Sequence, residues 1–145
     1  MKIENITKNN IEDCTRLYVQ VFSQPPWNEK LDDMLAQRRL SFLMSLPQAH
    51  GEKLYFDDRI IGFWLGYIEP VADFTELSVK EVLVHPEFQR KGIGSGIMLS
   101  AEKFAIKNNC KKITLNTNKN SIAYKFYKDL GYEDSENVMY MNKSL

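Results

Sequence analysis

The chain has 145 residues, 43% of them hydrophobic, which is about the size of one globular domain. Its 19 basic side chains balance 19 acidic ones, and this neutrality argues against a general binder of nucleic acid or other polyanions. No segment approaches the ~18 apolar residues of a membrane span, and the start "MKIENITKNN" lacks the apolar core of a signal peptide. Two cysteines, Cys14 and Cys110, without a C-x-x-C pair indicate buried thiols in a cytoplasmic protein.

The first half of the chain predicts a strand, two helices and a hairpin. Residues 2–6 form a short strand, and apolar positions spaced three and four apart predict an amphipathic helix over residues 10–22. The segment "SQPPWN" interrupts this helix because two prolines cannot continue it, and a second helix runs over residues 31–46. Residues 52–69 read as two strands that turn at Asp57-Asp58-Arg59.

The second half predicts strands that alternate with helices. Residues 76–86 read as a strand whose apolar end, "EVLV", belongs in the middle of a sheet. A glycine-rich loop leads into a helix, and the next strand, at residues 111–117, completes a parallel crossover. Residues 121–130 predict another helix, which Gly131 ends, and residues 137–145 a final strand. This alternation predicts a mixed α/β (α+β) fold.

The glycine-rich loop, "FQRKGIGSGIM" at residues 88–98, is a candidate anion site. A loop that enters a helix N-terminus offers unpaired N–H groups and the positive end of the helix dipole, and glycine lets a ligand approach the backbone. The P-loop pattern is excluded because its Lys and its spacing are missing. The dinucleotide fingerprint is excluded because the glycines do not follow the strand directly and no carboxylate ends the next strand.

A third pattern fits this loop. Residues 89–94, "QRKGIG", match Q/R-x-x-G-x-G/A, and the stretch resembles the pyrophosphate loop of the GNAT superfamily of N-acetyltransferases. Downstream, residues 120–132, "NSIAYKFYKDLGY", resemble that family's second signature. The order of strands and helices resembles the family over nearly the whole length. The resemblance implies one GNAT domain over residues 1–145, with a mixed sheet of six to seven strands, about four helices and parallel strands that splay apart at the cofactor.

The resemblance also implies acetyl-CoA as the co-substrate, with no metal. The pantetheine arm would run along the strand before the loop, where a bulge separates it from its parallel neighbour, and the Val82 N–H would polarise the acetyl carbonyl. Asn120 matches a residue that contacts the pantetheine, although it could instead cap the following helix. Gly96 lies outside the motif and reads as room for helix packing. The implied cofactor-binding residues are Val82, Leu83, Val84, Gln89, Arg90, Lys91, Gly92, Ile93, Gly94 and Asn120.

Two residues are implied for the chemistry. Tyr127 matches the tyrosine that gives a proton to the departing CoA thiolate, or it is a core tyrosine on an apolar stripe. Glu81 matches an acid that contacts the amine or a relaying water, or it is a solvated strand residue. Glu76 is its rival as the base, and Ser78 stands where other members carry the base. His85 reads as structural.

The acceptor is the least defined part of the prediction. Trp27, in the loop between the first two helices, is expected to line the acceptor site or to fold back onto the core. The stretch around it resembles small bacterial members described as aminoglycoside acetyltransferase-like, but a small-molecule or peptide amine is equally open. The expected partners exclude nucleic acid and membrane and include a second copy in a homodimer. The alternative function is a non-catalytic acyl-CoA-binding sensor or interaction module.

Overall fold

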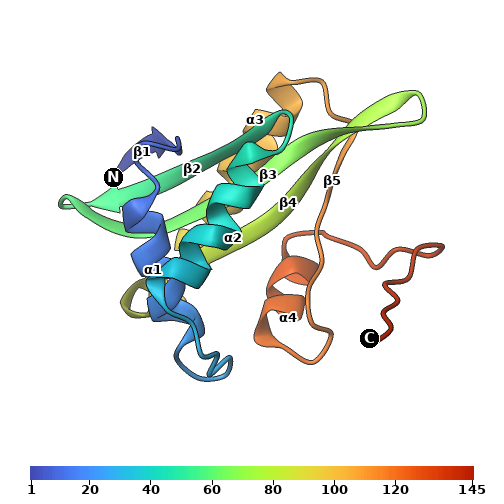
Figure 1. The fold of residues 1–145 in the computed structure, drawn as a ribbon. Helices are drawn as coiled ribbons and strands as arrows, with labels where there is room; N and C mark the ends of the chain where they lie inside the picture. Colours follow the sequence, from blue (N-terminus) through green and yellow to red (C-terminus); the bar gives the residue numbers. More distant parts are fainter. The chain divides into compact units, whose positions relative to one another are not determined.

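The computed structural model describes residues 1–145 as two compact units, residues 1–115 and residues 116–145, and each is described by itself. The first unit holds three helices and one sheet of five strands (Figure 1). A short 3-10 turn, Pro86–Phe88, follows the fourth strand. No helix is long and apolar enough to cross a membrane. The elements of this unit are β1 (Lys2–Asn5), α1 (Glu12–Phe22), α2 (Asp33–Ser45), β2 (Ala49–Phe56), β3 (Arg59–Val71), β4 (Phe74–Val84), α3 (Ile93–Lys107) and β5 (Lys112–Thr114).

The sheet has the order β1-β2-β3-β4-β5 and is mixed, as predicted. All neighbours are antiparallel except β4 and β5, which are parallel and joined through α3. The predicted hairpin is confirmed: Asp57 and Asp58 connect β2 to β3, and both have positive φ, 47° and 59°. Two such residues form the type I′ turn, whose twist matches that of the strands.

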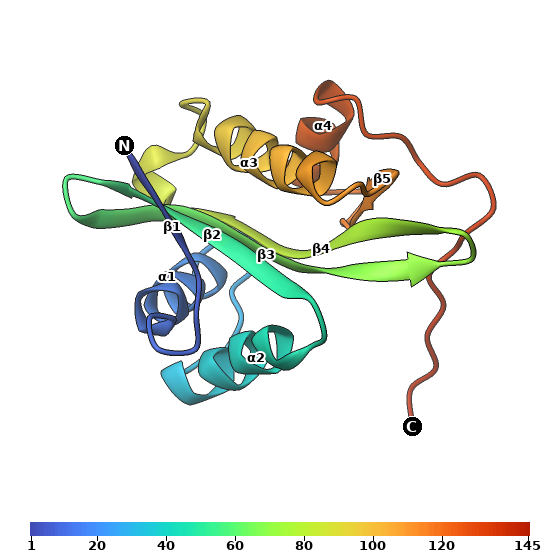
Figure 2. The same ribbon diagram turned by 90° about the horizontal axis from the view of Figure 1, so that it is seen from above.

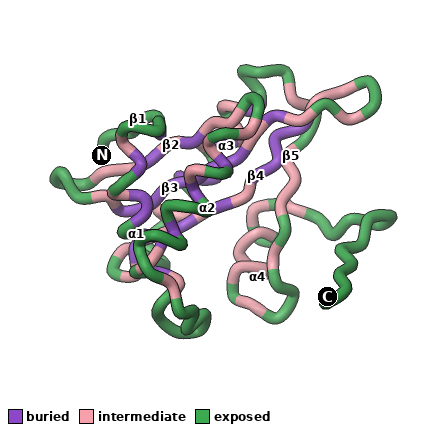
Figure 3. Tube along the Cα trace, in the orientation of Figure 1, coloured by how far each residue is buried: buried purple, intermediate pink, exposed green.

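Two apolar cores lie on opposite faces of this sheet. Helices α1 and α2 cover one face and α3 covers the other (Figure 2). The buried residues follow β3, β4 and the inner faces of these helices (Figure 3). Each strand contributes to both cores because successive side chains point to opposite faces, so Phe63 and Leu65 pack toward α1 and α2 whereas Trp64 packs toward α3.

A buried ion pair fastens β2 to α1. Lys53 is 2% exposed, and its Nζ donates to Asp13 Oδ1 at 3.0 Å and to the Asn10 carbonyl at 2.6 Å. Tyr55 also donates to Asp13. Burial by itself would raise the pKa of Asp13, but the hydrogen bonds from Tyr55 and Lys53 outweigh it and lower that pKa. Nothing in the sequence pattern predicted this pair, because the two residues meet only through the fold.

The second unit contains one helix, α4 (Ile122–Asp129). Its C-terminal stop is confirmed, since Gly131 follows it with φ of 93°. The strand predicted at residues 137–145 is wrong, because these residues form no ladder. Their apolar side chains bury little surface, with Val138 to Met141 between 77% and 84% exposed, so no burial favours a strand there. The sheet therefore has five strands rather than six to seven.

Candidate active site

A β-bulge in β4 sets the geometry of the candidate site. Leu65 of β3 is opposite Glu81 and Gly66 is opposite Val79, so Lys80 is an extra residue without a partner. Glycine is required opposite this irregularity, because a Cβ on Gly66 would lie 2.4 Å from the Ser78 carbonyl oxygen. An extra residue shifts the side-chain alternation by one.

The bulge exchanges the two faces of β4. Before it, Leu77 and Val79 pack into the core under α3. After it, Leu83 packs into the core under α1 and α2, while Val82 and Val84 contact the α3 side. Glu81, two residues before Leu83, therefore faces α1 and α2, where Arg39 of α2 meets it.

Beyond the bulge, the outer edge of β4 has no strand partner. The pairing with β5 covers only Glu76–Ser78. The Val84 carbonyl is turned to this edge, where it accepts from Gln89 Nε2 at 3.1 Å, whereas the His85 N–H donates to Ile61 of β3 at 2.8 Å. Because backbone groups alternate along a strand, the N–H and C=O of Val82 point to the same edge as Val84. The predicted bulge and separation from the parallel neighbour are thus confirmed.

The glycine loop presents a row of backbone donors. Gly96 is the first residue of α3 whose N–H finds a carbonyl, that of Gly92 at 3.1 Å, so the N–H groups of Arg90 through Ser95 have no hydrogen-bond acceptor. Arg90 and Gly92 have positive φ, 59° and 80°, which curls the loop before a helix of 15 residues. Successive N–H groups in such a loop form an anion-binding concavity, which the helix dipole strengthens.

The third glycine of the loop differs from the expectation. A Cβ on Gly96 would meet no heavy atom within 4 Å, so no neighbouring element packs against Gly96 and the prediction of close helix packing is wrong. The residue lies on the exposed side of α3. A helical pattern cannot reveal this side by itself, because it depends on which face meets the sheet.

His85 ends β4 as a structural residue, as predicted. It is 3% exposed, its Nδ1 accepts from the Glu87 N–H at 3.2 Å, and its Nε2 lies 2.8 Å from Arg59. Burial and the Arg59 charge lower the pKa of His85. The imidazole therefore fixes the turn between β4 and the glycine loop.

Glu81 is a buried carboxylate with one cationic partner. It is 8% exposed, and Arg39 Nε donates to its Oε1 at 2.9 Å. Burial raises the pKa of Glu81, and the Arg39 hydrogen bond and charge oppose this shift without cancelling it. Tyr18 of α1 lies in the same electrostatic environment: burial raises its pKa to about 12, and the Glu81 charge adds to that effect. The reading of Glu81 as a solvated strand residue is wrong.

Glu76, the alternative candidate for the base, contacts β5. Glu76 accepts from Thr114 Oγ1 at 3.2 Å and lies 3.8 Å from Lys112 Nζ, so it links β4 to β5. Ser78 is buried beside it in the same ladder. Both residues precede the bulge, and Glu81 is the carboxylate of β4 that Arg39 of α2 contacts beside it.

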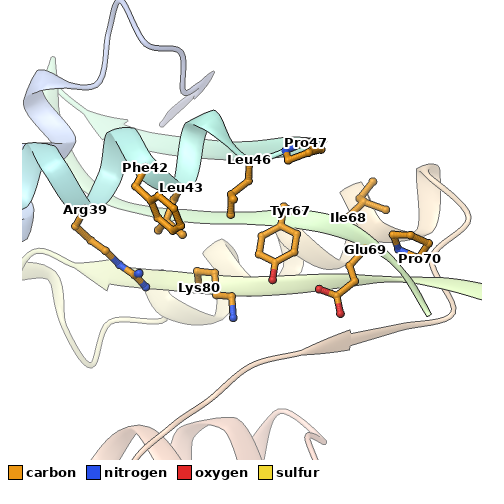
Figure 4. A pocket seen from close by; sticks show the side chains of 10 residues that line it. All are labelled: Arg39, Phe42, Leu43, Leu46, Pro47, Tyr67, Ile68, Glu69, Pro70 and Lys80. Carbon is orange, nitrogen blue, oxygen red and sulfur yellow. The ribbon is translucent and has the colours of Figure 1, made fainter. Parts of the chain in front are cut away.

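A pocket of about 470 Å³ lies beside the bulge, between α2 and the strands β3 and β4. Figure 4 shows the apolar side chains of α2 along one side and the polar ends of Arg39, Lys80, Tyr67 and Glu69 along the other. Trp27 is not among its walls; its ring packs 5.5 Å from that of Phe22 and stays 39% exposed. The pocket is lined by Arg39, Phe42, Leu43, Leu46, Pro47, Tyr67, Ile68, Glu69, Pro70 and Lys80.

Tyr127 and Asn120 lie in the second unit, which is described by itself. Tyr127 is on α4, with its ring edge-on to Phe126 and Tyr132. The alternative that Asn120 caps this helix is wrong, because Ser121 is the cap and its side chain accepts from the Tyr124 N–H. The roles of Tyr127 and Asn120 in the site stay predictions from the motif.

Two pocket residues were not anticipated from the sequence. Arg39 shows no signal, since charged residues on an amphipathic helix are usually solvated. Lys80 lies directly before the predicted base, but its direction depends on the bulge, and the residue that a bulge adds is fixed by strand register. Only the fold identifies both residues as walls of one pocket.

Comparisons with known proteins agree with the geometry. The model of the acetyltransferase (GNAT) family matches residues 11–132. Among solved structures, the chain is similar to an integron cassette protein from the mobile metagenome of V. cholerae (TM-score 0.81, 19% identity, 99% of this chain and 91% of that chain). It is also similar to aminoglycoside N-acetyltransferase AAC(6')-Iy in complex with CoA (TM-score 0.76, 19% identity, 99% of this chain and 95% of that chain).

A further similar structure is the ribosomal-protein-alanine N-acetyltransferase from Brucella melitensis biovar Abortus 2308 (TM-score 0.77, 18% identity, 99% of this chain and 100% of that chain). At these identities the solved structures establish the fold. The family model extends over 122 of the 145 residues and includes β4, the glycine loop and α4. The chain belongs to the acetyltransferase (GNAT) family.

Proposed function

We propose that the protein transfers the acetyl group of acetyl-CoA to a primary amine of a small molecule or peptide. The observation that carries the proposal is the row of N–H groups from Arg90 through Ser95 without acceptors, at the start of α3. A diphosphate needs several donors and a positive potential, and this loop offers both. The neighbouring edge of β4 offers unpaired backbone groups in the direction of the loop.

In this proposal the CoA pyrophosphate lies on the backbone N–H groups of the loop. Arg90 and Lys91 are exposed and add two positive charges beside it. The pantetheine arm follows the β4 edge toward the bulge, with hydrogen bonds to Val82. Since the Val84 carbonyl already accepts from Gln89, Gln89 holds the loop to the strand end and contributes mainly its backbone N–H to the phosphate.

The acetyl transfer follows as a direct attack within the ternary complex. The amine nitrogen bonds to the thioester carbonyl carbon, and the Val82 N–H stabilises the negative charge that develops on the carbonyl oxygen. The C–S bond then breaks, and its electron pair leaves on the CoA sulfur. Tyr127 donates its phenolic proton to that sulfur, as the motif predicts.

Glu81 takes the proton that the attacking amine releases, directly or through a water. A base works best when its pKa is near the working pH, and burial raises the pKa of Glu81 in that direction. Arg39 then stabilises the carboxylate between turnovers. The proton on Glu81 returns through solvent to the Tyr127 phenolate, which closes the cycle.

The test is release of CoA thiol from acetyl-CoA over a panel of amines, with mass spectrometry of the products. We expect amine-dependent release by the wild-type protein. Glu81→Gln should lose at least about tenfold in kcat, consistent with the loss of a general base. Tyr127→Phe should retain CoA affinity and lose turnover. Tight CoA binding with no turnover on any amine would favour the non-catalytic acyl-CoA-binding alternative.

A further inference from the structure

We propose that the acceptor is an α-amino acid with a large apolar side chain, held by its carboxylate on Lys80. The inference rests on the proposed function and specifies its substrate class. It concerns the pocket between α2 and the strands β3 and β4, at the bulge.

Lys80 is the cation of the pocket that forms no direct ion pair, although its charge lowers the pKa of the adjacent Glu81. It forms none of the ion pairs of the molecule, whereas the charge of Arg39 is matched by Glu81 at 2.9 Å. Lys80 is half-buried, and its Nζ lies 5.6 Å from the centre of the Tyr67 ring. A partly desolvated ammonium that faces a pocket and makes no direct ion pair favours an anionic group in the ligand.

The position of Lys80 along β4 fixes where that anion lies. Lys80 and Glu81 directly precede Val82, whose N–H is the proposed contact of the acetyl carbonyl. The carboxylate of the acceptor would therefore lie next to its reacting nitrogen. An α-amino acid has this arrangement, because one carbon separates its amine from its carboxylate.

The rest of the pocket suits an apolar side chain. Phe42 and Leu43 of α2, and Leu46 directly after this helix, face Tyr67 of β3 across the pocket (Figure 4). A volume of about 470 Å³ lies within the range of small-molecule sites. Phe42 is 56% exposed, so a bound side chain would cover apolar surface that is otherwise in contact with solvent.

The same charges disfavour a polycationic acceptor. The pocket carries Arg39 and Lys80 against one lining carboxylate, Glu69, which lies at the opposite end from Arg39 (Figure 4). Because Glu81 pairs with Arg39, a ligand with several ammonium groups would meet the charge of Lys80 next to the reacting end without a free carboxylate there, and like-charge contacts are costly. The charges of this pocket thus separate the proposed acceptor class from the aminoglycosides.

The test compares L-phenylalanine with L-phenylalaninamide, which has the same shape and no carboxylate. We expect kcat/KM for acetylation to be at least about tenfold higher for the amino acid, the effect of one hydrogen-bonded charge. Lys80→Met should abolish the preference and Lys80→Glu should reverse it. Lys103→Glu makes the same charge change on the exposed side of α3 and should leave the preference intact.

A second measurement does not need turnover. In the presence of CoA, N-acetyl-L-phenylalanine should bind the wild-type protein in calorimetry and bind Lys80→Glu at least about tenfold more weakly. The inference is overturned if the amide or the aminoglycoside sisomicin is acetylated as well as L-phenylalanine, which would leave the proposed function standing. It is also overturned if N-acetyl-L-phenylalanine does not bind. If no amine is acetylated while this ligand binds, the pocket assignment stands and the proposed function fails.

Discussion

Gly92 and Gly96 provide a sharp test of the loop, because the same substitution should have opposite effects at the two positions. Gly92 has φ of 80°, a left-handed conformation, and a Cβ there would contact nothing within 4 Å. Alanine at 92 therefore costs backbone strain alone, about 1–2 kcal/mol. Gly96 lies within α3 with equally open space, and alanine at 96 should stabilise the helix by about 1 kcal/mol.

The two variants should thus differ by about 2–3 kcal/mol in the free energy of unfolding, with wild type between them. For a chain of this length the difference corresponds to about 7–10 °C in Tm. Urea denaturation followed by the fluorescence of Trp64, which is 1% exposed, measures it. If Gly92→Ala is as stable as wild type, the left-handed conformation at position 92 is not required and the geometry of the loop is wrong.

CoA affinity provides a second readout of the same pair. To relieve the strain of an alanine at 92, the loop would turn its N–H groups away from their common direction, so Gly92→Ala should bind CoA more weakly. Gly96→Ala should bind it as wild type does, because the Gly96 N–H is already bonded to the Gly92 carbonyl. Equal losses in both variants would contradict the assignment of the pyrophosphate to residues 89–94.

Two further predictions concern buried charges. Lys53→Met leaves Asp13 without its cation and should lower the free energy of unfolding by about 3 kcal/mol at pH 7. Arg16→Met, which removes an exposed ion pair, should lower it by less than about 0.5 kcal/mol. Since the pKa of Asp13 is lowered, the loss should vanish as pH falls through that lowered pKa. Arg39→Gln should raise the pKa of Glu81 further. The resulting loss in the free energy of unfolding should be near zero below pH 4.5, where Glu81 is protonated, and should grow to about 2 kcal/mol above the raised pKa. If the loss in the free energy of unfolding does not change with pH for either variant, the ion pair assigned to that site is contradicted.

The features that the sequence predicted well are those with local causes. The turn at Asp57-Asp58, the helix stop at Gly131 and the loop before α3 each depend on the conformational preferences of a few adjacent residues. The strand at residues 137–145 was wrong for the complementary reason. Its composition favours a strand, but a strand forms only with a partner and a buried face, and composition supplies neither.

The chemistry of the pocket depends on register, which no local pattern encodes. Because of the extra residue in β4, the side chains of both Lys80 and Glu81 lie on the face of the sheet that α1 and α2 cover. A strand without the bulge would turn Glu81 toward α3, away from Arg39. Resemblance to a family predicted the bulge and the acid, and the identity of the neighbouring cation emerged only from the paired strands.

The central claim is that CoA binds on the donors of the glycine loop and along the β4 edge. Amide chemical shifts of the 15N-labelled protein, followed during a CoA titration, test it most directly. The account predicts the largest shifts at Arg90 through Ser95 and at Val82, the N–H groups that CoA would engage. Shifts confined to other elements, or saturation without any shift at residues 90–95, would contradict it.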